Sequence, residues 1–378
     1  MSDRRPDVVI VSSAHDFAGA EVYLLALLDA LAGRLRIELL ASDQAPEELR
    51  RRARLAGATT TPVRGLARRP SPVAVVRLAR ALHRRRPALV HVNLSDQGDG
   101  LVAIAAARLA RVPVSATLHI VLPQRRAVLE RLSRLALRQL REVVGVSDAV
   151  GGYLERQGAR FSVVRNGVAP PAAVPGARAQ LGLEADDFAI GGVGRLDAQK
   201  GWDVLCAAAP SVRERIPTAR FVVVGDGPER DALQAGAGAA DVRFAGYREQ
   251  AAGLIGAFDV LAVPSRYEGF GLVAVEAMLA GVPVVASRTG GLPEVVGDAG
   301  LLVAPGDAGE LADALVSLAQ DPQLRERLTR RAAERVRAHF GHERMARETL
   351  AAWRRAAAPQ PLPAGLGDER PEEAVATA

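Results

Sequence analysis

The chain has 378 residues but only one cysteine, Cys206, so it has no disulfide scaffold, and this count is typical of a reducing compartment. No apolar run reaches the roughly 18 residues that a membrane-spanning helix needs. The nearest run, residues 101–110, contains Arg108. The apolar stretch near the amino terminus, Val8–Val11, is too short for a secretory signal. We therefore expect a soluble, cytoplasmic protein.

Several common site motifs are also absent. The turn Gly225-Asp226-Gly227 does not complete G-x-G-x-x-G, because Arg230 occupies the place of the third glycine, which weakens the case for a dinucleotide oxidoreductase. Lys200 is not preceded by the glycine that a phosphate loop requires, and Gly145–Ala149 lacks the last glycine of a nucleophile elbow. Neither D-x-D nor H-E-x-x-H occurs, so the sequence supports no dedicated metal site.

Positive charge is concentrated in the first half of the chain. Residues 1–170 hold 27 arginines against 15 acidic residues, whereas residues 171–378 hold 22 basic and 28 acidic residues. A basic half of this kind suits anionic lipid headgroups or an acidic acceptor, and it equally suits a solvated surface in an arginine-rich protein. Nucleic acid is not an expected partner, because only 4% of the residues are aromatic and the arginines are scattered along helices.

Short β-branched or apolar runs alternate with longer amphipathic stretches, which is the pattern of parallel α/β sheets. The expected strands are Val8–Ser12, Ile37–Leu40, Ala88–Val92, Val114–Leu118, Val143–Val146, Ala189–Val193, Phe221–Val224, Val242–Phe244, Val260–Val263, Val282–Ala286 and Leu301–Val303. The expected helices are Ala20–Leu31, Pro72–Arg85, Gly98–Leu109, Val128–Leu140, Trp202–Arg215, Glu229–Ala235, Leu272–Leu279, Ala308–Ala319 and Pro322–Ala338. In segment 125–141 we expect the arginines to be solvated and the leucines Leu129, Leu132, Leu135 and Leu140 to share the other face.

A proline-rich stretch at 169–176 predicts a linker between two α/β domains, and the prolines and mixed charge after residue 356 predict a disordered tail. Ligands of open parallel sheets bind at the carboxyl ends of the strands. Function should therefore be sought in the loops that follow strands.

The segment richest in candidate chemistry is Pro264–Val296. A strand ends at Pro264, a loop with Glu268 and two glycines follows, and a helix is expected to begin near Gly271. The first N–H groups of a helix lack internal partners and lie at its positive end, which suits a phosphate. Glu276 lies about one and a half turns further on, where its carboxylate can accept hydrogen bonds from sugar hydroxyls. By itself, however, this spacing favours a solvated glutamate beside a flexible glycine turn.

The whole segment closely resembles the donor-binding segment of retaining glycosyltransferases of family 4. Further stretches agree in the correct order, namely Ala18–Glu21 with the family's G-G-A-E loop, Val164–Val168 with its N-G-V segment, Val193–Gly201 with G-R-L-x-x-x-K-G and Val223–Pro228 with the G-x-G-P turn. Together they span nearly the whole chain before the tail. One position departs from the family, because Ala18 stands where a glycine is usual; we expect its methyl group to restrict the loop and its approach to the phosphates.

The resemblance implies a GT-B fold, in which two Rossmann-like α/β/α domains face each other across a cleft. The first domain is expected at 1–170, with a last helix at 345–357 crossing back to it; the second is expected at 171–344, followed by the tail at 358–378. It also implies a retaining, metal-independent enzyme that moves a hexosyl group from a UDP- or GDP-sugar to an acceptor hydroxyl. No cofactor is expected, because the nucleotide sugar is a co-substrate.

The resemblance further implies a set of site residues. The expected catalytic residues are Arg195, Lys200, Glu268 and His119. The expected donor-binding residues are Gly19, Gly194, Arg195, Lys200, Gly225, Tyr247, Glu268, Phe270, Gly271, Leu272 and Glu276. Two cations, Arg195 and Lys200, would stabilise the departing diphosphate without a metal. Lys200 is the only lysine of the chain, which favours a need for a compact charge there.

The other residues have roles nearer the sugar and the base. Glu268 is expected at the donor sugar or reacting centre and Glu276 at the ribose hydroxyls. Phe270–Leu272 and Gly19 would contribute main-chain groups, and His119 would face the donor sugar. The loop with Tyr247 is expected to read the nucleobase. The pair His91 and Asn93 could border the acceptor, and His15 and Asp16 lie in the amino-terminal loop, which could also contact it.

The sequence leaves open the identity of the acceptor and the biosynthetic pathway. A lipid-linked, polysaccharide or small-molecule acceptor fits, in cell-surface glycan, glycolipid or secondary-metabolite biosynthesis. The expected location is the bacterial cytoplasm, with peripheral contact of the basic first domain with the inner membrane face as a further hypothesis. The alternatives are a catalytically silent nucleotide-sugar or glycan-binding module, or another GT-B activity such as an epimerase. A phosphorylase would need a pyridoxal lysine, and the single lysine already has a role.

Overall fold

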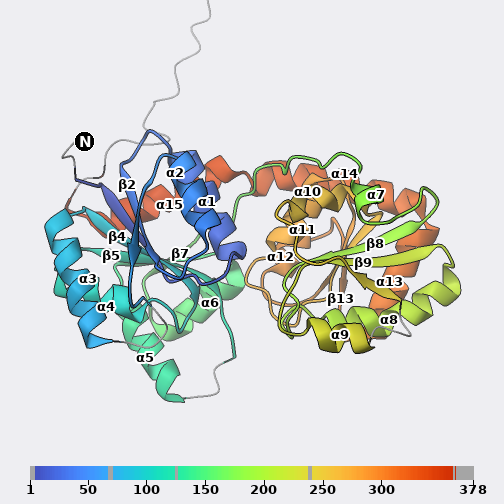
Figure 1. Ribbon diagram of the computed structural model, residues 1–378, viewed down its shortest axis with the longest axis horizontal. Coiled ribbons are helices and arrows are strands. Elements are labelled where there is room, and N and C mark those ends of the chain that lie inside the picture. The colour runs from blue at the N-terminus through green and yellow to red at the C-terminus, as the bar shows by residue number, and fades with distance from the viewer. Residues whose placement is uncertain (1–4, 67–70, 124–126, 237–240, 361, 363–378) are drawn as a thin grey trace, which may run out of the picture. The chain divides into compact units, whose positions relative to one another are not determined.

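The strands of the described residues lie in two wholly parallel sheets. The computed structural model describes residues 5–66, 71–123, 127–236, 241–360 and 362. The chain forms two compact units, Met1–Gly167 with His342–Ala378 and Val168–Gly341, which are described separately below (Figure 1).

The first unit contains a seven-stranded sheet of order β3-β2-β1-β4-β5-β6-β7. Its strands are β1 (Val8–Ser12), β2 (Ile37–Ser42), β3 (Thr59–Val63), β4 (Leu89–Asp96), β5 (Val114–Ile120), β6 (Glu142–Gly145) and β7 (Phe161–Val163). Its helices are α1 (Gly19–Leu31), α2 (Glu47–Leu55), α3 (Pro72–Arg85), α4 (Leu101–Leu109), α5 (Ala127–Arg138), α6 (Asp148–Gln157) and α15 (His342–Ala357). The interior strand β1 is buried along its whole length, as expected for a parallel strand covered by helices on both faces.

The second unit repeats this plan with a six-stranded sheet of order β10-β9-β8-β11-β12-β13. Its strands are β8 (Phe188–Val193), β9 (Ala219–Val224), β10 (Val242–Phe244), β11 (Val260–Val263), β12 (Val284–Ser287) and β13 (Leu301–Val303). Its helical segments are α7 (Ala177–Gln180), α8 (Trp202–Arg215), α9 (Arg230–Gly236), α10 (Ala251–Leu254), the 3₁₀ turn η2 (Ile255–Ala257), α11 (Leu272–Leu279), α12 (Leu292–Val296), α13 (Ala308–Gln320) and α14 (Pro322–His339).

Each sheet has one point at which the order of its strands reverses. In the first unit this point lies between β1 and β4, and in the second it lies between β8 and β11. At such a point the loops that leave the two strands diverge to opposite faces of the sheet, and ligands of open α/β folds bind there. The loops that follow β1, β8 and β11 are therefore the places where the fold itself favours a site.

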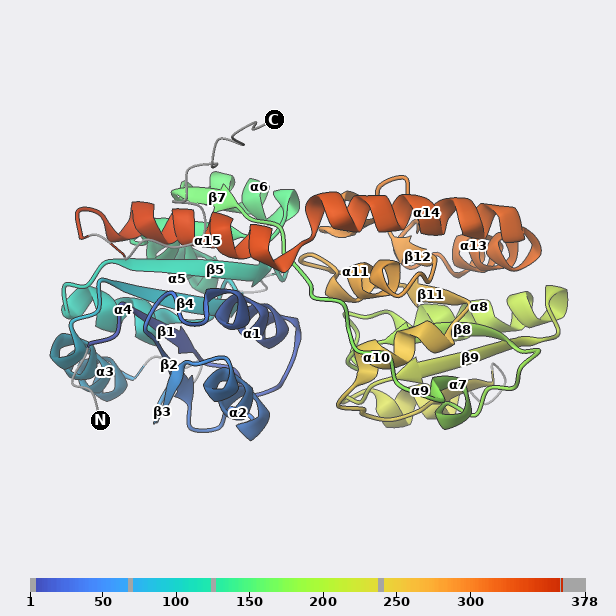
Figure 2. The ribbon, with the colours of Figure 1, turned by 90° about the horizontal axis from the view of Figure 1, so that it is seen from above.

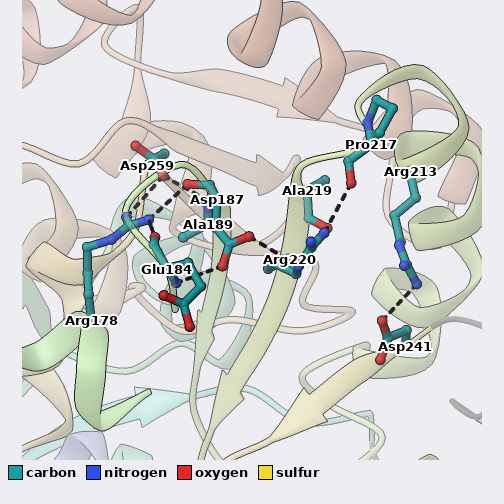
Figure 3. Close-up of polar contacts among 10 residues, drawn as sticks. All are labelled: Arg178, Glu184, Asp187, Ala189, Arg213, Pro217, Ala219, Arg220, Asp241 and Asp259. Carbon is teal, nitrogen blue, oxygen red and sulfur yellow. Dashed lines mark hydrogen bonds and ion pairs between the residues drawn. The ribbon is translucent and has the colours of Figure 1, made fainter. Parts of the chain in front are cut away.

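The amino ends of the second sheet are held by a polar network (Figure 3). Arg178, on α7 just after the predicted linker, donates to the carbonyl oxygens of Ala257, Glu184 and Asp187 at 3.0, 2.6 and 2.9 Å. It also faces Asp259, whose Oδ2 accepts a hydrogen bond of 2.7 Å from the Ala189 N–H. This network fastens the start of the second unit to its sheet at the edge opposite the carboxyl ends of the strands.

Helix α15 packs against α1 and the strands β4, β5 and β6 of the first unit, and Figure 2 shows it running along that sheet. Its Trp353 is fully buried and donates through Nε1 to His91 Nδ1 at 2.9 Å. The other ring nitrogen of His91 lies 3.1 Å from Thr117 Oγ1. Our expectation that His91 borders an acceptor is therefore wrong: burial lowers its pKa to about 3, and the neutral ring joins the sheet to α15.

Several elements differ from the sequence pattern. Strands β3 and β7 and helices α2, α6, α7, α10 and α12 are not predicted. Strand β3 is a partly exposed edge strand with an internal proline, β7 has only three residues, and α6 contains two consecutive glycines. Strand β4 continues to Asp96, so the helix expected from Gly98 begins only at Leu101. The predicted disordered tail lies outside the described residues except for 358–360, which form a turn, and 362.

In α5 the arginines Arg131, Arg134 and Arg138 are exposed as expected, but the expectation for the leucines is wrong. Leu129, Leu132 and Leu135 do not face the core: their exposed fractions are 42%, 44% and 58%. The helix packs instead through Ser133 and Leu137, which are 1% exposed. Heptad-like spacing identifies the helix but does not say which of its faces the sheet covers. No helix in the described part of the chain is both long and apolar enough to cross a membrane.

Candidate active site

Two loops meet at the reversal point of the second sheet. Strands β8 and β11 pair in parallel, so the loop 194–201 and the loop 264–271 leave adjacent strand ends. The Arg266 N–H donates to the Gln199 carbonyl oxygen at 2.7 Å, and Gln199 Nε2 donates to the Tyr267 carbonyl oxygen at 3.2 Å. These hydrogen bonds hold the two loops together and fix the positions of their charged side chains.

An ion pair links these loops. Lys200 Nζ lies 2.7 Å from Glu268 Oε2, and only 20% and 11% of the two side chains are exposed. The hydroxyl of the buried Ser265 donates to the same carboxylate oxygen at 3.2 Å. Hydrogen bonds between oppositely charged groups are shorter and stronger than those between neutral groups. The structure thus brings Lys200 and Glu268 together as predicted, and it adds Ser265, to which the sequence assigned no role although it lies three residues before Glu268.

Glu276 lies on α11, close enough to Lys200 for an electrostatic interaction between the two side chains. Among the described residues its carboxylate has no hydrogen-bond or ion-pair partner. Burial raises its pKa to about 7, although the charge of Lys200 acts in the opposite direction. A carboxylate with open lone pairs in a partly buried place can accept hydrogen bonds from two neighbouring hydroxyls of a ligand.

The start of α11 is open. Gly271 caps the helix with φ +102°, a conformation that an L side chain rarely adopts, and a Cβ atom there would lie 2.5 Å from Leu292 Cδ2. No side chain caps the helix, so its first N–H groups are available to an anion. The Phe270 ring is buried against Phe340, with 5.6 Å between centroids, so at Phe270 the main chain is the part left for a ligand.

A third loop, after β12, supports this arrangement. The Gly291 N–H donates to the Glu268 carbonyl oxygen at 3.2 Å, and a Cβ atom on Gly290 would overlap that same oxygen. Only a glycine allows such a close backbone approach. This pair of glycines lies within the motif-rich segment of the sequence, yet its spacing alone does not reveal that it holds the backbone of Glu268.

The two predicted cations have different surroundings. Arg195 Nε lies 3.5 Å from Asp197 Oδ2, and about half of the Arg195 side chain is exposed. The Arg195 carbonyl oxygen accepts a hydrogen bond of 2.7 Å from Trp202 Nε1, which fixes its backbone. Lys200 is the more enclosed cation and points to the loop with Glu268, whereas Arg195 pairs with an aspartate of its own loop.

Gly194, Gly225 and Tyr247 follow the neighbouring strands β8, β9 and β10. A Cβ atom on Gly225 would overlap the Gly194 carbonyl oxygen, and the Gly225 N–H donates to the Gly246 carbonyl oxygen at 3.0 Å. These three loops therefore pack backbone to backbone. The Tyr247 side chain is 59% exposed, which leaves it free to contact a ligand.

In the first unit, the loop after β1 leads into α1. Gly19 is the first residue of that helix, and the preceding Ala18 has φ −139° and ψ −167°. This extended backbone suits any residue, so Ala18 adopts it without strain, and the effect of its methyl group on an approach to phosphates stays a prediction. The Glu21 carboxylate accepts a hydrogen bond of 3.1 Å from the Ala18 N–H and fixes the start of the helix. His15 and Asp16 are exposed in the same loop.

His119 lies on β5 in a buried position. Its Nε2 lies 2.8 Å from Asn93 Oδ1, and the Asn93 amide nitrogen donates to the Ala20 carbonyl oxygen at 3.3 Å. This assigns the proton to Nε2 and leaves Nδ1 as an acceptor. Burial lowers the pKa of His119 to about 3, so the ring is neutral near pH 7. Asn93 is 1% exposed and positions His119, so its expected place beside an acceptor is wrong.

No cluster of three or more His, Cys, Asp or Glu side chains suited to a metal ion occurs in the part of the chain that the structure describes. Metal independence stays a prediction. The geometry of the second unit offers one ammonium group, two carboxylates and an open helix start around the same loops, which together can bind a phosphate group and a polyhydroxylated group.

Two family models match the chain. The model of glycosyl transferases group 1 matches residues 187–321, and that of Glycosyltransferase Family 4 matches residues 17–170. A 2-deoxystreptamine glucosyltransferase of Streptomyces kanamyceticus is 34% identical over 273 residues, which are 64% of this chain and 70% of that protein. A D-inositol 3-phosphate glycosyltransferase of Actinosynnema mirum is 38% identical over 230 residues, or 55% of this chain, which spans about half, 54%, of that relative.

Solved structures agree with these matches. HepE from Anabaena, crystallised with UDP-glucose, is 25% identical with a TM-score of 0.79, over 92% of this chain and 100% of that one. Sucrose-phosphate synthase from Thermosynechococcus elongatus is also 25% identical, with a TM-score of 0.77, over 92% of this chain and 98% of that one. The two sheets described above are those of the GT-B fold that the sequence motifs predict.

Proposed function

Since this chain belongs to glycosyltransferase family 4, we propose that it transfers a hexosyl group from a UDP-sugar to an acceptor hydroxyl, with retention of the anomeric configuration and without a metal ion. A GDP-sugar is the alternative donor. The observation that carries this proposal is the cluster of Lys200, Glu268 and Glu276 beside the open start of α11. The UDP-glucose bound to HepE supports a uridine nucleotide.

The reaction breaks the bond between the anomeric carbon and the β-phosphate oxygen of the donor, so negative charge develops on that phosphate. Lys200 offers a compact cation to this charge, and the first N–H groups of α11 offer aligned dipoles. Arg195, half exposed in the same loop as Lys200, can add a forked pair of N–H donors to the phosphate oxygens. Together these groups stabilise the departing diphosphate without a metal.

Retention fits attack of the acceptor oxygen on the face that the diphosphate leaves. In that case the acceptor hydroxyl passes its proton to the departing phosphate as the new glycosidic bond forms. No covalent glycosyl intermediate is needed, and Glu268, already held by Lys200 and Ser265, would orient the donor sugar and not attack it. Neutral His119 would act through a hydrogen bond and not as an acid.

Glu276 is assigned to the ribose hydroxyls of the donor. Its carboxylate lacks partners among the described residues and lies one turn into α11, so it can accept two hydrogen bonds while the helix start faces the phosphates. Tyr247, exposed after β10, would contact the base. With these roles, the base, the ribose and the diphosphate of the donor would all contact loops at the carboxyl ends of strands of the second sheet.

The acceptor is proposed to be a small polyhydroxylated molecule. The relatives are named for 2-deoxystreptamine and D-inositol 3-phosphate, so these two compounds are the first acceptors to test. Lipid-linked and polysaccharide acceptors form the second group. A cytoplasmic location is proposed together with the enzyme activity, and the single cysteine is consistent with it.

The direct test is incubation with labelled UDP- and GDP-hexoses, scored for transfer to an acceptor and for slow hydrolysis of the donor. We expect turnover with at least one donor, undiminished by EDTA, and an anomeric proton coupling in the product that matches the configuration of the donor. Tight binding with neither transfer nor hydrolysis would instead favour a silent binding module.

A further inference from the structure

Exposed apolar side chains gather on one helix of the first unit. Val128, Leu129, Leu132 and Leu135 of α5 are 66%, 42%, 44% and 58% exposed, and Leu109 of the neighbouring α4 is 59% exposed. Positions 128, 132 and 135 are four and three residues apart, so they form a continuous ridge along the helix. Single exposed leucines are ordinary, but a ridge of this kind on a helix that also has a well-buried face indicates an interaction surface.

Arginines border this ridge. Arg131, Arg134 and Arg138 of α5 and Arg108 of α4 are all exposed. Arg134 and Arg138 donate to Gln157 on α6, to its Oε1 at 2.9 Å and its carbonyl oxygen at 2.8 Å, so their guanidinium groups are held beside the helix. The one acid of α5, Glu130, faces Tyr153, whose hydroxyl lies 3.3 Å from Glu130 Oε1.

The charge extends beyond α5. From residue 71 to residue 141 the sequence holds 13 arginines and three acidic residues. Two of those acids are buried, Asp96 as the last residue of β4 and Asp99 in the loop that follows, so they add little negative charge to the surface of α3, α4 and α5. These three helices pack in sequence order (Figure 1), and α5 presents the apolar ridge within their positive charge.

We propose that the α5 surface, defined as Val128, Leu129, Leu132, Leu135 and the arginines Arg108, Arg131, Arg134 and Arg138, docks on an anionic lipid bilayer. A bilayer interface supplies both chemistries at once, because acyl chains accept an apolar ridge while anionic headgroups meet the flanking arginines. A second copy of the chain is a poorer occupant, because it would bring the same arginines against each other in a symmetric contact.

The test measures co-sedimentation of the full chain with vesicles of phosphatidylcholine alone and of phosphatidylcholine with phosphatidylglycerol. We expect binding only to the anionic vesicles, and a steep loss of binding at high salt because the headgroup attraction is screened. No binding to anionic vesicles in dilute buffer would overturn the proposal.

Two double variants separate the apolar and the electrostatic contributions. Leu132→Gln with Leu135→Gln should weaken binding by at least about tenfold, because less apolar area enters the interface. Arg108→Gln with Arg131→Gln should weaken it by about fivefold for each arginine and reduce its salt dependence. All four side chains are exposed, so the fold should be retained, which circular dichroism can verify.

Matched controls come from the same unit. Leu55, 76% exposed on α2, and Arg34, exposed after α1, lie outside the α5 surface. Leu55→Gln and Arg34→Gln should leave vesicle binding unchanged. Equal binding by all variants would place the contact elsewhere and overturn the assignment to α5.

A spectroscopic probe reports insertion directly. Trp202 and Trp353 are 2% and 0% exposed, so their emission should not respond to vesicles. In a Leu132→Trp variant, the fluorescence emission of the new tryptophan should shift to shorter wavelengths when anionic vesicles are added. Brominated lipid in the vesicles should quench this emission. If, instead, light scattering shows a wild-type dimer that the Leu132→Gln and Leu135→Gln pair converts to a monomer, the ridge joins two copies and the membrane proposal is wrong.

Discussion

Lys200 and Glu268, 68 residues apart in the chain, form an ion pair of 2.7 Å at the carboxyl ends of two neighbouring strands. The pair depends on the strand order, because the reversal between β8 and β11 is what places these two loops side by side. An incoming diphosphate would share the ammonium group with Glu268. The lysine is therefore positioned before the donor binds, which limits the reorganisation needed when charge develops on the leaving group.

Replacement of Lys200 tests this role. We expect Lys200→Ala to lower kcat by about 10²- to 10³-fold, because one positioned donor to the developing phosphate charge is lost. Lys200→Arg keeps the charge but not the compact geometry, so its rate should lie between those of Lys200→Ala and the wild type. Steady-state kinetics with the best donor provide the measurement, and near-normal rates for both Lys200→Ala and Glu276→Ala would refute the assigned roles.

Glu276 predicts a pH dependence of donor binding. Its pKa is raised to about 7 by burial, and the ionised form is the one that accepts two hydroxyl hydrogen bonds. The KM for the donor should therefore rise as the pH falls below about 7. Glu276→Gln should raise the KM at pH 8 and remove most of this pH dependence. A wild-type profile that stays flat from pH 6 to pH 8 would contradict the assignment.

The carboxyl group of Glu276 also predicts a pH dependence of folding stability. Donor binding should strengthen as the pH rises, whereas the stability of the folded state should fall. The folded state holds the proton of Glu276 up to about pH 7, whereas the unfolded chain releases it near the ordinary value of 4.5. Stability from this group is thus full below pH 4.5 and is lost as the pH rises to 7, by roughly 3 kcal/mol. Glu276→Gln should gain stability relative to the wild type over this range, as urea unfolding at several pH values can measure; a constant difference would argue against the raised pKa.

Gly271 predicts a backbone effect at the start of α11. In Gly271→Ala the residue must adopt φ +102° and its methyl group meets Leu292, so we expect a loss of roughly 2 kcal/mol in the free energy of unfolding and weaker donor binding. Gly256 is a matched control, because a Cβ atom there has no neighbour within 4 Å. Gly256→Ala should change neither property. Equal effects of the two substitutions in urea unfolding would show that the site does not depend on Gly271.

Much of the fold follows from the sequence, and the reasons for the misses are physical. Strand β1 is a continuous apolar run because helices cover both of its faces, so the pattern reveals it. The edge strand β3 is partly exposed and reads TTTPV, so it lacks this signal. The ridge of α5 shows a different limit: periodicity groups Leu132 and Leu135 on one face, but the arrangement of α4, α5 and α6 decides that this face lies outward.

Part of the geometry of the candidate site follows from the sequence where motif and topology coincide, while the roles of its residues stay predictions. Lys200, Glu268 and Gly271 lie in loops that follow strands, and the structure joins Lys200 and Glu268 as an ion pair. The sequence does not reveal partners that come from folding alone. Ser265 holds Glu268 through one hydroxyl, and Asn93 fixes the tautomer of His119 from a neighbouring strand.

Trp353 predicts how firmly α15 is attached to the first sheet. Trp353→Phe removes the donor to His91 Nδ1, which still has Ser115 Oγ at 2.9 Å, so we expect a loss of about 1 kcal/mol. Trp353→Ala also removes a fully buried ring and should cost about 3–5 kcal/mol. Thermal or urea unfolding gives both values. If Trp353→Ala were as stable as the wild type, α15 would not depend on this contact.

The claim on which the others depend is that the loops around Lys200 and the start of α11 bind a nucleoside diphosphate. Thermal unfolding with UDP and with GDP, for the wild type and for Lys200→Ala, tests it most directly, because a ligand of the folded state alone raises the melting temperature. We predict a concentration-dependent rise for the wild type with one of the two nucleotides and a much smaller rise for Lys200→Ala. The same rise in both proteins, or no rise with either nucleotide, would contradict this account.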